Sequence, residues 1–441
     1  MFSRRDLWRL ILPLVIEQLL AVTIGMADTV MVASVGEAAV SGISLVDSVN
    51  ILLINIFSAL ATGGAIIAAQ YIGREDRENA CAAAKQLLLA STAVSLVIMA
   101  GCMFFQRPLL TLIFGQIEPL VMDNANTYFF LSALSYPFLA VYNSGAALFR
   151  SMNNSKISMV TSVGMNLINI AGNALTIYGF HMGVTGAGLS SLISRAAGAA
   201  AMLVLLQNPH NLIHIEHIWK PELRPRMIRN ILQIGIPNGL ENGMFQIGKI
   251  LVQSLIASFG TAAIAANAVA SSVASLAQIP GGAIGLGMIT VVGQCVGARD
   301  YRQARSYTLK LTGVSYASLI AMNLISLVLL DPLIGMYNLS PEGMELARLI
   351  LLWQIGVSSA LWPASFTLPN GLRAANDVKF TMLVSIFSMW VFRIGFSYLL
   401  AQWLQMGLLG VWLAMYVDWA VRIVFFLFRF FRGRWMNKQI I

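Results

Sequence analysis

The sequence predicts an all-α integral membrane protein in which twelve transmembrane helices form two pseudo-symmetric six-helix bundles around a central cavity. Its 441 residues are 58% apolar and 11% charged, whereas soluble globular domains are about 25% charged. Apolar stretches of twenty or more residues recur along the whole chain, and the second half of the sequence repeats the first. The composition alone excludes a water-soluble fold.

Each long apolar stretch can cross a hydrocarbon core of about 30 Å as a helix, which hydrogen-bonds its own backbone. A transmembrane β-barrel would instead alternate apolar and polar residues, and the almost continuously apolar run from Phe380 excludes it. The predicted spans are residues 8–34, 46–72, 83–105, 121–148, 157–178, 184–206, 228–258, 266–296, 307–330, 344–371, 380–402 and 407–430.

The Lys and Arg residues predict which loops face the cytoplasm. With a cytoplasmic N-terminus, the inner segments hold most of the 28 basic residues, and the outer loops hold essentially Arg107 alone. This asymmetry accounts for the net charge of +9 without nucleic acid as a partner. We therefore expect a multi-pass protein of the plasma or inner membrane with both termini in the cytoplasm. The basic start at Arg4, Arg5 and Arg9 is expected to precede a retained first helix rather than a cleaved signal.

An internal repeat predicts the domain organisation. Shifting the sequence by 224 residues aligns Pro13 with Pro237, Glu17 with Glu241, Gly36 with Gly260, Gln70 with Gln294, Gly73 with Gly297, Gly183 with Gly407 and Gly186 with Gly410. We expect an N-terminal lobe over residues 1–206, a cytoplasmic linker over 207–230 and a C-terminal lobe over 231–441. Six helices per lobe make the repeat parallel, and such repeats favour alternating access by rocking of the lobes.

Three acidic residues are candidates for binding a coupling cation. Glu17 and Asp28 lie eleven residues apart in the first predicted helix, which returns to within about 20° of the same face. A desolvated Asp28 could gain and lose a proton as a cation leaves and approaches, although it could also be a polar helix-end residue. For Glu17 and its repeat mate Glu241, an interhelical hydrogen bond is the alternative.

Polar residues at helical spacing mark the seventh predicted helix. Five polar residues follow one another at intervals of four, four, three and four positions: Asn238, Asn242, Gln246, Lys249 and Gln253. In lipid such a stripe must line a cavity or another helix, so we expect it to oppose the first helix across the cleft. Lys249 then needs a carboxylate partner, and the sequence leaves open which of the three acids supplies it.

The fifth helix also carries polar residues toward the interior of its lobe. Asn166, Asn169 and Asn173 could coordinate sodium or bind substrate, and interhelical packing bonds are the alternative. In the second lobe, Arg393, Asp418 and Arg422 are interpreted as a structural ion cluster. Pro13 and Pro237 sit one turn before the paired glutamates and are predicted hinges, with simple packing as the alternative.

Three of the four histidines, His210, His214 and His217, lie in the linker at metal-like spacing. We favour a polar stripe on a short interfacial helix and predict no metal and no cofactor other than a coupling ion. No histidine falls at membrane depth, and no nucleophile or converging pair of carboxylates accompanies one, so the chain is not expected to be an enzyme.

The segments "LPLVIEQLLAVTIGMADTVMVASVG", "QYIGRED", "LFRSMNNSK", "NLINIAGNALTIYG" and "PNGLRAANDVKF" together resemble the multidrug and toxic compound extrusion family across nearly the whole chain. The resemblance implies efflux of amphipathic or cationic drugs in exchange for protons or sodium. It maps the coupling aspartate onto Asp28, a helix 5 Asn and Asp pair onto Asn169 and Asn173, and a helix 6 hydroxyl onto Ser191. The second acid is therefore missing, and Ile24 replaces an aromatic residue of the family.

The predicted function is secondary active antiport of small molecules by a monomer surrounded by membrane lipid. A lipid-linked oligosaccharide flippase is the alternative within the same superfamily, because Lys249 could suit an anionic headgroup. Major-facilitator transporters also consist of two parallel six-helix halves, but this sequence lacks the complete loop motif that is typical of them. From another class, an ion channel would conduct without counter-transport.

Overall fold

The computed structural model describes residues 2–115, 117–216 and 222–438, without the side chains of residues 24–29. Within these ranges every regular element is a helix, in agreement with the predicted all-α class. The chain forms two compact units. The N-terminal unit is Ser3–Gly239, and the C-terminal unit contains Phe2 and the residues from Leu240 onward.

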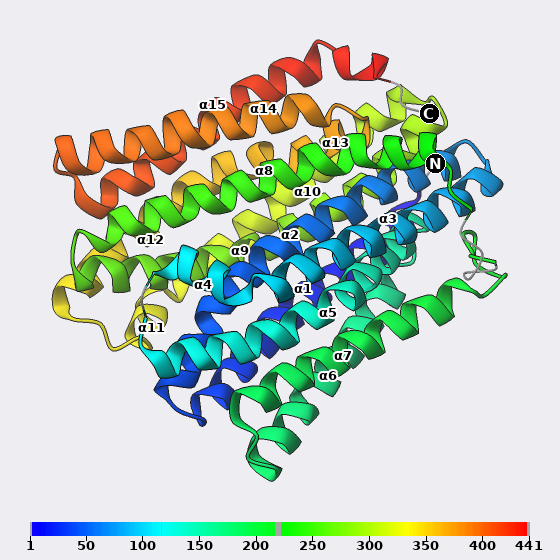
Figure 1. The fold of residues 1–441 in the computed structure, drawn as a ribbon. Helices are drawn as coiled ribbons and strands as arrows, with labels where there is room; N and C mark the ends of the chain where they lie inside the picture. The colour runs from blue at the N-terminus through cyan, green and yellow to red at the C-terminus, as the bar shows by residue number, and fades with distance from the viewer. Residues whose placement is uncertain (1, 116, 217–221, 439–441) are drawn as a thin grey trace. The chain divides into compact units, whose positions relative to one another are not determined.

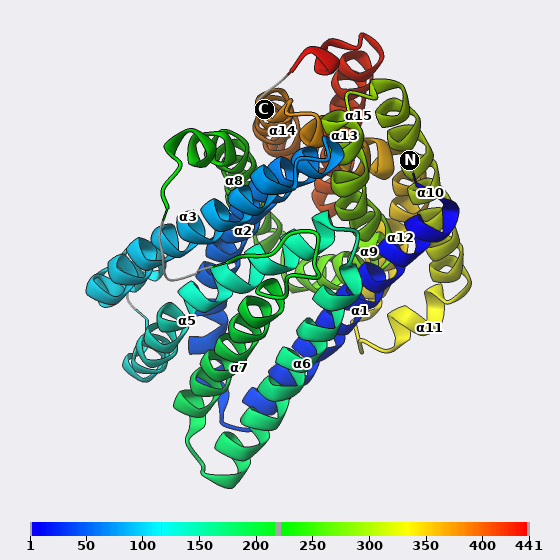
Figure 2. The same cartoon turned by 90° about the vertical axis from the view of Figure 1, so that its right-hand side faces the viewer.

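Long helices in the N-terminal unit pack around α5. The elements are α1 (Arg4–Ala33), α2 (Glu37–Gly73), α3 (Arg77–Phe104), α4 (Gln106–Phe114), α5 (Pro119–Ser151), α6 (Ser155–Asn173), the π-helical η1 (Ala174–Gly179), α7 (Gly183–Leu206) and the first part of α8 (Pro225–Ala257). Helix α5 contacts α2, α3 and α7, while α6 packs against both α1 and α7 (Figures 1 and 2). Residues of α1, α2, α5, α6 and α7 line the interior of this unit.

The C-terminal unit has more π-helical turns. Its elements are the remainder of α8, α9 (Thr261–Gly297), α10 (Tyr301–Val328), α11 (Leu330–Gly335), α12 (Pro341–Trp362), η2 (Pro363–Thr367), α13 (Leu368–Ala374), α14 (Val378–Ser388), η3 (Met389–Gly395), η4 (Tyr398–Trp403), α15 (Gly407–Phe431) and the 3₁₀ turn η5 (Arg434–Asn437). Helix α9 packs against α10, α12 and α13, and α15 packs against α12, η3 and η4.

Every predicted span overlaps a helix or a run of consecutive helices, but most helices begin earlier than predicted. Helix α2 begins nine residues earlier, at Glu37. Hydrophobicity marks only the apolar part of a helix, whereas polar residues cap its end: the side chain of Ser3 accepts from the Asp6 amide at the start of α1. Within the described residues, eight spans are long and apolar enough to cross a membrane, namely α2, α3, α7, α9, α10, α12 to α13, α14 to η4, and α15.

The repeat is visible in the backbone as well as in the sequence. Left-handed φ values recur 224 residues apart, at Glu75 (62°) and Arg299 (58°), and again at Gly36 (135°) and Gly260 (98°). Helices α3 and α10, which follow the first of these turns, also start alike. Asp76 accepts from the Asn79 amide, and Asp300 accepts from the Gln303 amide. The two units therefore share the backbone conformation of these turns even where, as at Glu75 and Arg299, the residues differ.

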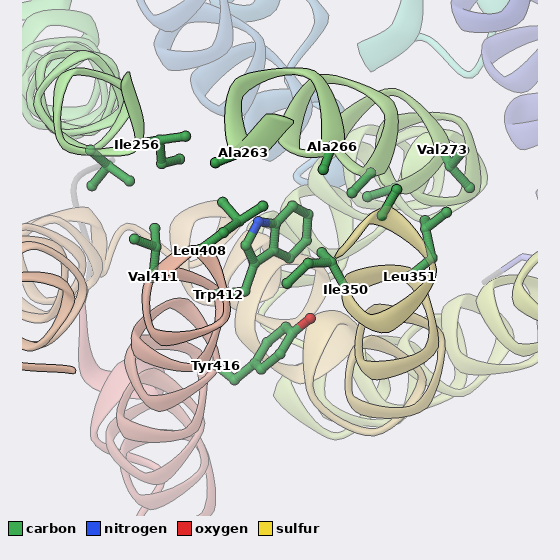
Figure 3. Close-up of a cluster of buried hydrophobic side chains, with 14 of the residues drawn as sticks. Ile256, Ala263, Ala266, Val273, Ile350, Leu351, Leu408, Val411, Trp412 and Tyr416 are labelled. Carbon is green, nitrogen blue, oxygen red and sulfur yellow. The ribbon is translucent and has the colours of Figure 1, made fainter. Parts of the chain in front are cut away.

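A cluster of apolar side chains forms the core of the C-terminal unit between α9, α12 and α15. Figure 3 shows Trp412 of α15 beside Ala266 of α9 and Ile350 of α12. Small alanines along α9 let neighbouring helices approach closely, which is how helices associate in membranes. The Trp412 indole also donates to Asn267 Oδ1 at 3.0 Å. Helices α9 and α15 are therefore held together by a hydrogen bond as well as by apolar packing.

Gly410 tests the close packing of α15 on η4. A Cβ added there would lie 2.7 Å from the Ala401 backbone nitrogen. We expect Gly410→Ala to lower the free energy of unfolding by about 1–3 kcal/mol through overpacking, measured as thermal unfolding in detergent. Gly356→Ala is the matched control because no atom lies within 4 Å of its added Cβ. Equal unfolding temperatures for the two variants would contradict the close approach.

Candidate functional site

A polar cavity of about 350 Å³ lies inside the N-terminal unit. All four residues predicted for a polar interior in this lobe line it, namely Asn166, Asn169, Asn173 and Ser191. Asn169 Nδ2 donates to Ser191 Oγ at 3.2 Å, and Asn173 Nδ2 donates to Asn169 Oδ1 at 3.4 Å. Helices α6 and α7 thus present a connected set of amide and hydroxyl groups to one space.

The same cavity contains a carboxylate, Asp47, that the sequence reasoning did not select. Asn50 Nδ2 donates to Asp47 Oδ1 at 3.1 Å, and Tyr136 donates to Asn50 Oδ1 at 2.8 Å. Asp47 was missed because the second helix was predicted to begin at residue 46. The observed helix begins at Glu37, so Asp47 lies about 15 Å along it.

An arginine from α7 completes the charged groups of this cavity. Arg195 lines it and interacts electrostatically with Asp47, while its Nη1 donates to Ser135 Oγ at 2.6 Å. Arg195 stands in the middle of the 24-residue α7. Its position in the centre of an apolar span was the signal that could have identified it, because a charge at membrane depth is a functional candidate by default.

The two paired glutamates occupy equivalent places in the two units. Ser158 Oγ donates to both Glu17 carboxylate oxygens, at 3.0 and 3.2 Å, and accepts from Arg150 Nη1 at 3.3 Å. In the C-terminal unit, Arg373 Nη2 lies 2.6 Å from Glu241 Oε1. Glu241 is therefore paired with Arg373 rather than with Lys249. Glu17 thus joins α1 to α6, and through Ser158 to Arg150 at the end of α5, whereas Glu241 joins α8 directly to α13.

Asp28 belongs to α1, but its side chain lies outside the described residues, as does that of Ile24. Pro13 and Pro237 lie inside α1 and α8, and their role as hinges stays a prediction.

A second cavity, of about 240 Å³, lies inside the C-terminal unit. Lys249 and Gln253 of the predicted α8 stripe line it, together with Arg393 from η3 and Asn267 from α9. The other members of the stripe, Asn238, Asn242 and Gln246, do not line this cavity.

The two cavities occupy equivalent positions in the repeat. Residues 224 apart line both of them: Val32 and Ile256, Ile43 and Asn267, Asp47 and Ser271, Asn169 and Arg393, Ala187 and Val411, Ser191 and Met415. Each unit of the repeat therefore encloses a cavity at the same position. Its chemistry differs, because a serine replaces the carboxylate of Asp47 and an arginine replaces the amide of Asn169.

The predicted ion cluster of the second lobe borders this cavity. Arg422 Nε lies 2.8 Å from Asp418 Oδ1, and Arg393 Nη1 lies 3.9 Å from Asp418 Oδ2. The i, i+4 pairing of Asp418 with Arg422 is thus confirmed. Phe245 faces the positive groups, with its ring centroid 5.3 Å from Arg393 Cζ and 5.1 Å from Lys249 Nζ.

The linker is held to α3 by an arginine. Arg77 donates to the backbone carbonyls of Pro209, Asn211 and Leu212 at 2.9–3.0 Å. His214 Nε2 lies 3.1 Å from Glu216 Oε1, and His217 falls outside the described residues. In the ranges the structure covers, no three His, Cys, Asp or Glu side chains are grouped to hold a metal ion.

Duplicated helical units with helices long enough to span a membrane and interior polar cavities are typical of a membrane transporter. The chain belongs to the MatE family, whose profile matches residues 13–175 and again residues 237–399. These matches start 224 residues apart, as the repeat requires.

Known relatives match almost the whole chain in sequence, and solved structures share its fold. It is 29% identical to the uncharacterized transporter YisQ of Bacillus subtilis, covering 98% of this chain and 95% of the relative. It is 24% identical to the probable multidrug resistance protein NorM of Thermotoga maritima, covering 99% and 94%. A crystal structure of MATE in the bent conformation has a TM-score of 0.90 at 19% identity, covering 99% and 97%. A MOP superfamily transporter from Pyrococcus furiosus has a TM-score of 0.89 at 19% identity, covering 98% and 96%.

The Glu241 and Arg373 pair is expected to stabilise the fold. Glu241→Gln leaves the largely buried Arg373, whose side chain is 15% exposed, without its counter-charge. The loss should approach the cost of breaking a buried ion pair, about 3–5 kcal/mol in unfolding free energy, measured by thermal unfolding in detergent. The double variant Glu241→Gln with Arg373→Gln should lose less stability than the sum of the single variants. A Glu241→Gln protein of unchanged stability that has lost coupled transport would instead assign Glu241 to ion coupling.

Proposed function

We propose that the protein is a secondary active antiporter that exports amphipathic compounds in exchange for protons or sodium. The observation that carries this proposal is the carboxylate Asp47 beside a ring of amide and hydroxyl groups in the N-terminal cavity. Carboxylate and neutral oxygen ligands together suit a proton or a sodium ion. The relatives named multidrug resistance proteins support export as the direction of transport.

Asp28 belongs to the same proposed cation site. Val32, four residues after Asp28 on α1, lines the N-terminal cavity, and residues four apart share a helix face. The Asn169, Asn173 and Ser191 groups would then provide neutral ligands, while Arg195 limits the cost of keeping Asp47 charged. Glu17 and Glu241 act in this proposal as interhelical supports, because both are engaged by side chains of their own units.

Alternating access between two six-helix lobes would couple the two fluxes. The cation neutralises a carboxylate that costs at least about 2.5–3.5 kcal/mol to expose to hydrocarbon, so binding the cation favours a different lobe arrangement from losing it. One charge moving through about 100 mV supplies about 2.3 kcal/mol. That energy is enough to drive export of a neutral solute against a gradient of about fiftyfold.

The proposal includes twelve crossings with both termini in the cytoplasm. Four further segments, α1, α5, α6 with η1, and α8, are long enough to cross a hydrocarbon core but are not among the eight apolar spans. Polar residues of α5 and α6 line the N-terminal cavity, which supports crossing helices whose polar faces turn inward. We propose residues 1–206 and 231–441 as the lobes, residues 207–230 as the linker, and a monomer as the working unit.

A lipid-linked oligosaccharide flippase is the second candidate function. The observation that favours it is the pair of cationic side chains, Lys249 and Arg393, in the C-terminal cavity, since positive groups bind phosphate headgroups. The same pair favours amphipathic over simple cationic drugs as substrates of the antiporter. Translocation of a lipid-linked oligosaccharide in liposomes without any pH or sodium gradient would support the flippase over the antiporter.

Proteoliposomes carrying a fluorescent amphipathic dye test the antiporter. We expect Asp47→Asn and Asp28→Asn each to abolish dye movement driven by an imposed pH or sodium gradient, because a neutral amide cannot exchange one positive charge. The gradient that drives the wild-type protein identifies the coupling ion.

Asp123→Asn is the control for these variants. Asp123 is an exposed acid of the same unit, paired with Arg107 on the surface, so its neutralisation should leave driven dye movement unchanged. If Asp47→Asn and Asp28→Asn both matched this control at equal protein content, the proposed cation site would be wrong.

A further inference from the structure

Among the described residues, the lining of the C-terminal cavity contains two cationic side chains, Lys249 and Arg393, and no acidic one. Asp418 is the acid near it, and its charge is shared. One carboxylate oxygen accepts from Arg422 at 2.8 Å and from Ser388, and the other lies 3.9 Å from Arg393. Asp418 is therefore shared by Arg393 and Arg422, and no carboxylate of the described lining is left for Lys249, so the wall of the cavity carries excess positive charge.

Lys249 has no acidic partner within the described part of the C-terminal unit. Glu241, on the same helix, is occupied by Arg373 at 2.6 Å. The nearest compensation for Lys249 is the face of Phe245, 5.1 Å from its ammonium group, and this ring also faces Arg393 and Arg422. A shared aromatic face weakens the repulsion among cations but does not cancel their charge.

Some hydrogen-bond donors of the Arg393 guanidinium have no strong acceptor within the described protein. Its Nε is buried and has no hydrogen-bond partner among the described atoms, and its Nη2 meets only the sulfur of Met415, a weak acceptor, at 3.2 Å. The planar guanidinium suits an oxyanion with two oxygens. Arg393 also lies in the π-helical η3, a distortion that often occurs at functional sites.

A chain of amides leaves a further donor at this cavity. The Trp412 indole donates to Asn267 Oδ1, and Asn267 Nδ2 donates to Gln253 Oε1 at 3.1 Å. With its oxygen occupied, Gln253 has its Nε2 group left to donate. The rest of the lining is largely apolar, from Val252, Ile256, Val411 and Met415, and can contact a hydrocarbon portion beside the charged group.

We propose that the C-terminal cavity binds an anionic oxygen group, such as phosphate, sulfonate or carboxylate, through Lys249, Arg393 and Gln253. The anion supplies the charge that the cavity wall lacks, whereas a cationic group would meet like charges and no acid. Within the proposed function, this assigns anionic and zwitterionic amphiphiles as the substrate class. It also gives the repeated cavities opposite tasks, because the equivalent N-terminal space holds Asp47 where this one holds Ser271.

Equilibrium binding of radiolabelled octyl phosphate to the full-length protein in uncharged detergent tests the site. We expect saturable binding to the wild-type protein and a loss of affinity of about tenfold or more in Lys249→Gln, because the variant removes one cation from the anion. Lys310→Gln is the matched control: Lys310 lies on α10 of the same unit, over the Tyr307 ring and away from the cavity, and should bind like the wild type. Arg393→Lys keeps the charge beside Asp418 and should weaken binding by removing the guanidinium fork.

Competition identifies the source of the anion. Displacement of octyl phosphate by inorganic phosphate would assign the site to a free oxyanion as well, and displacement only by alkyl phosphates would assign it to an amphiphile headgroup. Equal displacement by octyltrimethylammonium, equal binding by Lys249→Gln and Lys310→Gln, or absence of saturable binding would each overturn the proposal. No ion gradient is present in this assay, so a failure of antiport leaves its outcome unchanged.

Discussion

The cost of placing a charged or unpaired polar group in hydrocarbon governs this structure. Each such group costs several kcal/mol, and the charged side chains discussed above are accordingly held by a partner or lie at a cavity. Asp418 with Arg422 and Glu241 with Arg373 are of the first kind. Asp47 and Lys249 are of the second kind. This division separates groups that hold the fold together from groups that can meet a ligand.

The repeat explains why the two kinds recur in both units. A turn at Glu75 and its mate at Arg299, each followed by an aspartate cap, fixes the start of equivalent helices. The same helices then enclose equivalent cavities. The repeated fold sets the position of each cavity, and the side chains that line it set its chemistry. Replacing Asn169 by Arg393 changes the charge of the space without changing the fold that encloses it.

Sequence reasoning predicted the helices, the repeat and the amide-lined interior at Asn166, Asn169 and Asn173 because these follow from apolar length and helical period. The same reasoning missed Asp47, because hydropathy marks only the apolar part of a helix and gives no information on the polar residues that extend it. It also left the partner of Glu241 open. That partner, Arg373, is 132 residues away, and the pairing depends on how helices far apart in the chain pack within one unit.

The two cavities differ in the charge of their linings, and this bears on how one fold could serve the two unlike solutes of the proposed antiport. A carboxylate that is neutralised by a cation and a basic wall that is neutralised by an anion both lower the cost of a dry interior when they are filled. Each unit is then most easily closed when it holds its own ligand. Because both spaces belong to one repeat, a few differences at equivalent positions, such as Asp47 in one and Ser271 in the other, are enough to give one lining a carboxylate and to make the other basic. The division of coupling ion and transported headgroup that we propose rests on this difference in charge.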